Sequence, residues 1–189
     1  MRIFILLGHP NNDSLASDLA DVYEHEARKA GHDVKRLNIG DLHFDPILHK
    51  GYKEIQELEP DLKLVQEDMK WCEHFVLIYP LWWSSMPALL KGMWDRMLLP
   101  GFAFHMNKDG MSWQKLLKGR TARVIMLSKN WPIVIRSLFG DFTNEISRAI
   151  LGFAGFKVHL TEIGHSEDAG AERIARWEKM IGDLARKGA

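Results

Sequence analysis

Ile3-Phe4-Ile5-Leu6-Leu7-Gly8 begins as an uninterrupted apolar run and stops abruptly at a glycine. A run of this kind is typical of a strand that is covered on both faces, as in a parallel sheet. Similar runs occur at Phe75-Val76-Leu77-Ile78-Tyr79 and at Val124–Leu127. Shorter strands are predicted at Val34–Ile39 and Val158–Ile163, so we expect a sheet of about five strands.

Helical periodicity fills the intervals between these strands. Ser14 can cap the first helix, which is expected to end at Ala30-Gly31. Further helices are predicted at Leu62–Cys72, Pro87–Leu99, Asp141–Leu151 and Ala171–Arg186. Because strand and helix alternate, the chain is predicted to be an α/β protein. A parallel five-stranded sheet with helices on both faces is expected, in one domain over residues 1–189.

Composition excludes several classes of protein. Lys and Arg number 25 and Asp and Glu also number 25, so the formal net charge is zero. This balance argues against a nucleic-acid partner, which usually meets a basic face. The single cysteine, Cys72, excludes an internal disulfide framework and favours a reducing, cytoplasmic location. No apolar run approaches the roughly 20 residues that span a bilayer, so no integral membrane segment is expected. No HExxH or paired histidine motif predicts a metal site.

Ligands of parallel sheets bind beyond the carboxyl ends of the strands, where the strand order reverses. The first such loop, Gly8-His9-Pro10-Asn11-Asn12-Asp13-Ser14-Leu15, has neither a GxGxxG fingerprint nor a Walker A lysine. It nevertheless leads into a helix N-terminus, where free N–H groups and the helix dipole favour phosphate. His9, Asn11 and Ser14 can add side-chain donors. The alternative is that Ser14 is only an N-cap and the loop is solvated.

The second loop, Pro80-Leu81-Trp82-Trp83-Ser84-Ser85-Met86-Pro87, places two adjacent tryptophans between prolines. A flat conjugated ring would suit this stretch, with backbone amides meeting its polar edge. The alternative is that the pair packs in a core or a subunit interface. A third loop, Ser128-Lys129-Asn130-Trp131-Pro132, is either a wall of the site or an ordinary connection.

The most specific stretch of the chain follows the second strand run. It reads Tyr79-Pro80-Leu81-Trp82-Trp83-Ser84-Ser85-Met86-Pro87-Ala88-Leu89-Leu90-Lys91-Gly92-Met93-Trp94-Asp95-Arg96. This block resembles the NAD(P)H:quinone oxidoreductases of the flavodoxin-like fold, which include mammalian quinone reductases, bacterial modulators of drug activity and the ancillary proteins of potassium-efflux systems. The resemblance extends almost end to end, through Gly8-His9-Pro10 with Ser14, Asp61-Leu62, Phe102-Ala103-Phe104, Gly140-Asp141, Gly152-Phe153, Gly155-Phe156 and Ile163-Gly164-His165.

The resemblance implies a flavodoxin-like three-layer sandwich with NAD(P)H dehydrogenase (quinone) activity. The flavin is expected to be FMN, with FAD as the alternative through an adenine site at Arg173 and the loop from Gly164 to Gly170. The expected cofactor-binding residues are His9, Asn11, Ser14, Leu15, Pro80, Leu81, Trp82, Trp83, Ser128, Lys129 and Asn130. The backbone of Trp82, Trp83 and the loop Ser128, Lys129 and Asn130 would face the flavin ring, and no side chain is assigned a catalytic role.

Family members are homodimers with the site at the interface. The expected substrate pocket comprises Phe104, Met106, Trp131 and Phe139. NAD(P)H would reduce the flavin and leave, and a quinone-like acceptor would take its place in a ping-pong sequence.

Two departures from the family pattern affect the expected mechanism. The family often has Thr-Gly-Gly after the strand that ends at Leu127, whereas Pro132 in this chain lacks an N–H, so one donor to the flavin is expected to be missing. Ile133 and Phe139 stand where mammalian members carry a tyrosine and a histidine, and neither can donate a proton. We therefore expect no proton relay through side chains.

Three other functions remain open from the sequence. The first is FMN reductase or azoreductase activity, separable only by comparing acceptors. The second is a flavin-binding regulatory subunit, which would associate with a potassium-efflux-type transporter at its cytoplasmic face. The third is a flavodoxin-like electron carrier, which the zero net charge disfavours because carriers tend to be acidic.

Overall fold

The central sheet of the computed structural model, which describes residues 1–189, consists of five parallel strands. They are β1 (Arg2–Leu7), β2 (Asp33–Asn38), β3 (His74–Pro80), β6 (Thr121–Ser128) and β7 (Lys157–Gly164), in the order β2-β1-β3-β6-β7. The predicted α/β fold and all five predicted strands are confirmed. This order is that of the flavodoxin-like doubly wound sheet.

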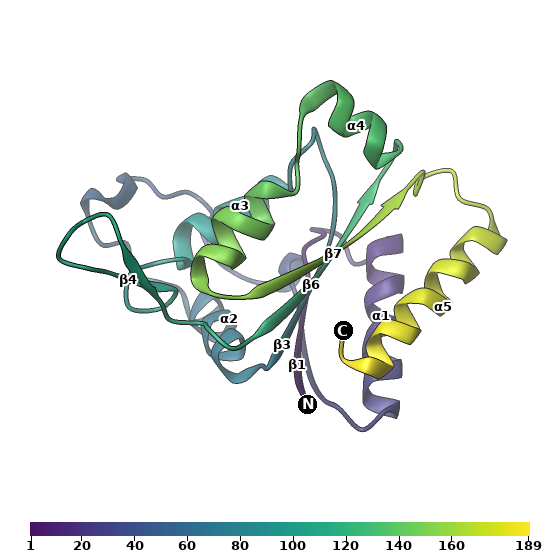
Figure 1. The fold of residues 1–189 in the computed structure, drawn as a ribbon, viewed down its shortest axis with the longest axis horizontal. Helices are drawn as coiled ribbons and strands as arrows, with labels where there is room; N and C mark the ends of the chain where they lie inside the picture. The colour runs from purple at the N-terminus through teal and green to yellow at the C-terminus, as the bar shows by residue number, and fades with distance from the viewer.

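Helices cover both faces of the sheet (Figure 1). On one face lie α1 (Leu15–Lys29) and α5 (Ala171–Lys187). On the other lie α2 (Pro60–Trp71), α3 (Ala88–Met97) and a π-helix, η3 (Glu145–Gly152). The helix predicted at Asp141–Leu151 therefore exists, but it begins later and is wound as a π-helix. No helix combines the length and apolar character that crossing a membrane requires.

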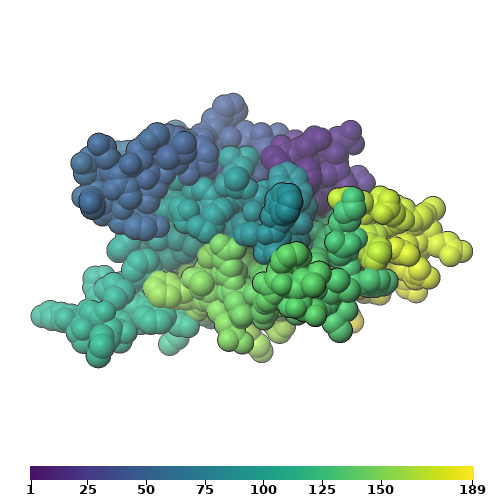
Figure 2. All heavy atoms as spheres, turned by 90° about the horizontal axis from the view of Figure 1, so that it is seen from above, coloured from purple at the N-terminus to yellow at the C-terminus, as the bar shows by residue number.

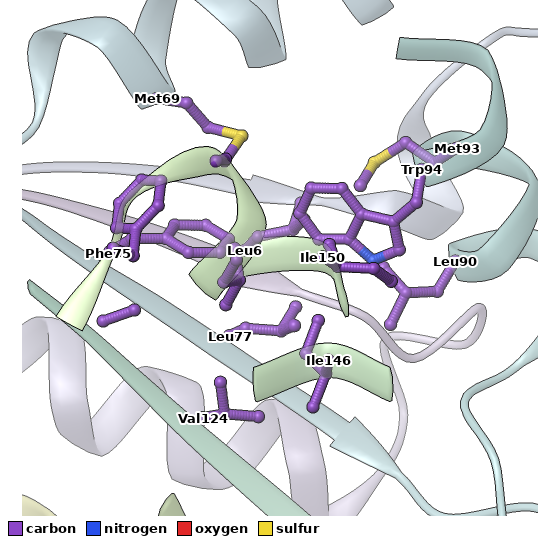
Figure 3. Packing of buried hydrophobic residues seen from close by; sticks show 14 of the residues in the cluster. Leu6, Met69, Phe75, Leu77, Leu90, Met93, Trp94, Val124, Ile146 and Ile150 are labelled. Carbon is purple, nitrogen blue, oxygen red and sulfur yellow. The ribbon is translucent and has the colours of Figure 1, made fainter. Parts of the chain in front are cut away.

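The two faces carry separate cores because successive strand residues point to opposite sides. In β1, Ile3, Ile5 and Leu7 pack under α1 and α5, whereas Phe4 and Leu6 pack on the other face. Figure 3 shows how this second core is filled. Strand residues meet side chains from α2, α3 and η3, and the labelled residues are Leu6, Met69, Phe75, Leu77, Leu90, Met93, Trp94, Val124, Ile146 and Ile150.

The strand order reverses between β1 and β3. From β1 the chain passes outward to β2 on one side, and from β3 it passes to β6 and β7 on the other. Gly8 leaves β1 while its N–H donates to the Ile78 carbonyl, at 2.7 Å. A Cβ at Gly8 would lie 2.8 Å from the Leu90 side chain and 3.0 Å from the Tyr79 Cβ. Glycine therefore lets the first loop pass close to β3 and α3.

The segment between β2 and α2 is largely irregular and contains two short 3₁₀ turns, η1 (Ile39–Asp41) and η2 (Gly51–Lys53). It is anchored by Arg96, whose side chain is fully buried. The guanidinium donates to the carbonyls of Asp45 and Glu57 and pairs with the Glu59 carboxylate. A buried guanidinium with these partners ties the segment to α3, since leaving any of them unpaired is costly.

Besides the two 3₁₀ turns, one helix and two strands were not predicted: α4 (Pro132–Phe139), β4 (Phe104–Met106) and β5 (Trp113–Lys115). The strands β4 and β5 pair as a separate antiparallel hairpin. In Figure 2 this teal-green segment lies at one end of the molecule and the yellow α5 at the other. Pro132 occupies the first turn of α4, where helix N–H groups have no partner within the helix, so the ring fits this position well.

Candidate functional site

A cavity of about 300 Å³ opens at the carboxyl edge of the sheet, beside the point where the strand order reverses. Its walls come from the loops after β1, β3, β6 and β7. The lining residues are His9, Ser14, Leu15, Ala16, Pro80, Leu81, Trp82, Leu127, Lys129, Ser166 and Glu167. Seven of the predicted cofactor-binding residues are in this set: His9, Ser14, Leu15, Pro80, Leu81, Trp82 and Lys129. The other four, Asn11, Trp83, Ser128 and Asn130, are not among the lining residues.

The first loop presents a hydrogen-bond donor from His9. The Asn11 N–H donates to His9 Nδ1 at 3.0 Å. Since Nδ1 accepts, the neutral imidazole carries its proton on Nε2, and that N–H remains available to a ligand. Asn11 itself shapes the loop, because its carbonyl accepts from the Ser14 hydroxyl at 3.2 Å and its side-chain oxygen accepts from the Asp13 N–H at 3.0 Å.

The N-terminus of α1 supplies further donors. Ser14 has extended backbone angles, and its Oγ accepts from the Ser17 N–H at 3.3 Å, so it is the N-cap of the helix. The N–H groups of Leu15 and Ala16 belong to the first turn and have no partner within the helix. Both residues line the cavity. The positive end of the helix dipole therefore faces this space, which is the arrangement that binds phosphate.

A tight turn follows β3. Trp82 and Ser85 exchange two backbone hydrogen bonds, of 2.9 and 3.0 Å, and the central residues Trp83 and Ser84 have φ values of 50° and 60°. Two positive φ values define a type I′ geometry, which normally favours asparagine and glycine. The N–H groups of Trp83 and Ser84 have no hydrogen-bond partner, and the Trp83 side chain is fully exposed.

The third loop is fastened to the loop after β7. The buried Ser128 hydroxyl donates to the Asn130 carbonyl at 2.8 Å, so it is already engaged within the protein. The Ser128 carbonyl accepts from the N–H and the hydroxyl of Ser166, at 3.0 and 3.1 Å. At the cavity rim Lys129 Nζ lies 2.8 Å from the Glu167 carboxylate, and the hydrogen bond and charge of Glu167 raise the pKa of Lys129.

Four cavity residues are not among the predicted flavin-binding residues: Ala16, Leu127, Ser166 and Glu167. The last two lie in the loop from Gly164 to Gly170, which the sequence offered only for the adenine of FAD. Ala16 and Leu127 directly adjoin positions that were identified. Ser166 and Glu167 follow β7, and the signal that indicates them is the sheet rule itself, which brings the loop after the last strand to the same edge. No group of three or more His, Cys, Asp or Glu side chains is arranged to hold a metal ion.

The predicted substrate-pocket residues lie elsewhere in the chain. Phe104 lines a second cavity, of about 330 Å³, with Trp94 and Phe153, and this cavity shares no lining residue with the first. Met106 is exposed on the β4–β5 hairpin. Trp131 and Phe139 lie at the two ends of α4 and are 55% and 70% exposed. The first cavity of a single chain thus does not include any of these four residues.

A cavity of this form, at the strand-order reversal of a β2-β1-β3-β6-β7 sheet, defines a flavodoxin-like protein. The family described as having the flavodoxin-like fold matches residues 1–183. The chain belongs to this family, in the group that contains the NAD(P)H oxidoreductases and quinone reductases.

Three curated relatives support this grouping. An uncharacterized NAD(P)H oxidoreductase of Haemophilus influenzae is 32% identical over 138 residues, with 69% of this chain and 66% of the relative covered. An uncharacterized NAD(P)H oxidoreductase of Escherichia coli is 29% identical over 54% of this chain and 55% of the relative. Ribosyldihydronicotinamide dehydrogenase [quinone] of Mus musculus is 25% identical over 95% of this chain and 90% of the relative. The chain therefore matches under two thirds of the length of the two bacterial relatives.

Solved structures share the fold over the whole chain. Smu.1420 of Streptococcus mutans superposes with a TM-score of 0.84 at 25% identity, covering 99% of this chain and 100% of that one. An FMN-dependent NADH-azoreductase of Bacillus anthracis, solved in complex with FMN, has a TM-score of 0.72 at 18% identity and 98% coverage of both chains. At that identity the second likeness establishes the fold alone.

Proposed function

We propose that the chain is a flavin-dependent NAD(P)H:quinone oxidoreductase whose cofactor, FMN, binds in the cavity at the carboxyl edge of the sheet. One observation carries the proposal. The cavity extends from the first turn of α1, whose N–H groups are unpaired, to Trp82, the first residue of a turn whose central N–H groups are also unpaired. Phosphate donors at one end and amide donors beside apolar and aromatic side chains at the other are what a flavin mononucleotide requires.

The residues present fit the cofactor in two parts. The phosphate would be bound by the N–H groups of Leu15 and Ala16 together with His9 Nε2–H, and by the Ser14 hydroxyl once it turns from the Asn11 carbonyl, to which it donates in this structure. The ring would lie against Pro80, Leu81 and Trp82, with its polar edge toward the N–H groups of Trp83 and Ser84.

When bound, the flavin supplies the two-electron chemistry that links NAD(P)H oxidation to quinone reduction. The protein positions the reactants and presents backbone dipoles to the ring. The side chains of Ile133 and Phe139 have no acidic proton to donate. We therefore infer that protons reach the site from solvent rather than through a side-chain relay. Donor and acceptor would use the same open face in turn, in a ping-pong sequence.

The size of the cavity supports FMN over FAD. Its volume of about 300 Å³ is at the lower end for ligand sites, which favours the smaller cofactor.

We further infer that the working unit is a cytoplasmic homodimer. Phe104 and Met106 lie away from the first cavity of their own chain, which is the arrangement expected if a second copy contributes the facing wall. Sedimentation tests this inference, since the chain should then sediment as a species of twice its 21.8 kDa mass.

An anaerobic visible spectrum tests the proposed activity. The protein is reconstituted with FMN and scanned before and after addition of NADPH, and again after addition of a quinone. Bleaching by NADPH and recovery with the quinone are expected. Bound flavin that does not bleach would overturn the enzymatic role, and failure to bind either FMN or FAD would overturn the proposal altogether. Parallel assays with azo and quinone acceptors then identify the acceptor class.

A further inference from the structure

Glu145 and Ser85 connect the turn after β3 to the π-helix η3. The Ser85 hydroxyl donates to Glu145 Oε2 at 2.9 Å, and both residues are half-buried. The Glu145 carboxylate makes no other hydrogen bond and no ion pair. The two residues come from different elements, since Ser85 closes the turn and Glu145 is the first residue of η3.

The turn needs external support because of its backbone conformation. Trp83 and Ser84 both have positive φ, and neither is glycine. A residue other than glycine is strained in this conformation, and it persists there only where surrounding contacts fix it. The two backbone hydrogen bonds between Trp82 and Ser85 are internal to the turn. The Ser85–Glu145 bond ties the turn to the rest of the protein.

The η3 helix is a suitable anchor. A π-helix is rare, and short π segments occur frequently at functional sites. Ile146 and Ile150 of η3 are buried in the core against the sheet (Figure 3). Glu145 therefore extends from an element anchored in the core toward a strained turn.

We propose that Glu145 is a positioning residue for the flavin-binding turn: by accepting the Ser85 hydroxyl, it holds the Trp82–Ser85 turn in the conformation that leaves the N–H groups of Trp83 and Ser84 free for the flavin ring. The proposal rests on the proposed function for its ligand. The effect is through the hydrogen bond and does not require the negative charge, because an amide oxygen at this position can accept the same proton.

The first test uses the flavin-free protein, so it is independent of cofactor binding. Backbone ¹⁵N relaxation is compared for the parent chain, Glu145→Ala, Glu145→Gln and Ser85→Ala. We expect fast motion to increase at Trp83 and Ser84 in both alanine variants and to stay unchanged in Glu145→Gln. Glu178→Gln is the control, because Glu178 is also half-buried but lies on α5 and forms no hydrogen bond or ion pair. Unchanged motion in both alanine variants would overturn the proposal.

The second test is a double-mutant cycle on FMN affinity, with the absorption band of the bound flavin as the spectroscopic readout. Each alanine variant should weaken FMN binding about 10-fold, or about 1.4 kcal/mol, and the double variant should be no weaker than the single ones. The flavin band should shift in the alanine variants and not in Glu145→Gln. If the affinity losses of the two alanine variants multiplied in the double variant, the positioning role would be refuted. An equal loss of FMN affinity in Glu178→Gln would refute it as well. A parent chain that binds no flavin would instead refute the proposed function, while the relaxation result would still decide whether Glu145 holds the turn.

Discussion

The imidazole of His9 meets the indole of Trp82 edge-on, with ring centroids 5.5 Å apart. His9 comes from the loop after β1 and Trp82 from the turn after β3, so this contact joins the two sides of the strand-order reversal. The phosphate end and the ring end of the proposed cofactor site are thereby fixed relative to one another. In the proposed site His9 would have two roles, because its Nε2–H would donate to the phosphate while its ring packs on Trp82.

Replacement of His9 by alanine should weaken FMN binding about 10-fold, the value of one charge-assisted hydrogen bond. Riboflavin lacks the phosphate, so its affinity should change much less. Fluorescence titration of both flavins measures the ratio, and His25→Ala, on the exposed face of α1, serves as the control. An equal loss for riboflavin and FMN would show that His9 acts only through Trp82.

Two substitutions at Ser14 separate helix capping from phosphate binding. Ser14→Ala removes the N-cap and should lower the free energy of unfolding by about 1 kcal/mol. Ser14→Asp keeps a good cap but places a negative charge beside the phosphate, so we expect normal stability and a loss of FMN affinity of more than about 10-fold. Urea unfolding and FMN titration measure the two effects. Full FMN affinity in Ser14→Asp would mean that the phosphate does not bind at this helix end.

The fold could be predicted because its inner strands are buried on both faces. Ile3–Leu7 and Phe75–Tyr79 are continuous apolar runs, and in a chain that alternates strand and helix such runs are typical of the inner strands of a parallel sheet. The loops that form the site could be predicted because ligands of parallel sheets bind beyond the carboxyl ends of the strands. The free N–H groups at Trp83 and Ser84 could not be predicted, because a type I′ turn at these two residue types contradicts local preference.

The elements that were missed lack a buried apolar stripe. In α4 only Ile135 is buried, while Ile133, Leu138 and Phe139 face outward, so periodicity gave no signal. The hairpin strands β4 and β5 have three residues each, too few for alternation to be recognised. The Ser85–Glu145 hydrogen bond depends on where η3 begins, and helix boundaries are the least certain feature of a sequence pattern.

Stability should fall as the pH drops below neutrality because of His74, which is fully buried with its Nε2 unpartnered. Burial, helped by the charges of Arg123, His159 and His32, lowers the pKa of His74 to about 4. Above pH 6.5 the imidazole is neutral in both the folded and the unfolded chain, so its contribution is complete. Between pH 6.5 and 4 only the unfolded chain takes up the proton, which removes up to about 3 kcal/mol from the free energy of unfolding.

Urea unfolding at a series of pH values measures this dependence. His74→Asn can keep the hydrogen bond that His74 Nδ1 makes with the Thr121 hydroxyl, at 2.7 Å, but cannot titrate. Its stability should therefore vary less between pH 6.5 and 4 than that of the parent chain. His43→Gln changes a side chain that is 96% exposed and should retain the parent slope. An unchanged slope in His74→Asn would assign the acid sensitivity to other groups.

Introducing a histidine at Phe139 tests the inferred lack of a side-chain proton relay. Phe139 is 70% exposed at the end of α4, so the substitution should leave stability within about 0.5 kcal/mol. If the acceptor binds near this position, Phe139→His should raise quinone turnover severalfold, because an imidazole can donate a proton near neutral pH. The gain should decline above a pH of about 6.5 as the imidazole loses its proton. Leu138→His adds the same group to a neighbouring position that is 69% exposed, and it should give no gain. Equal turnover in the two variants and the parent chain would show that Phe139 lies outside the acceptor site.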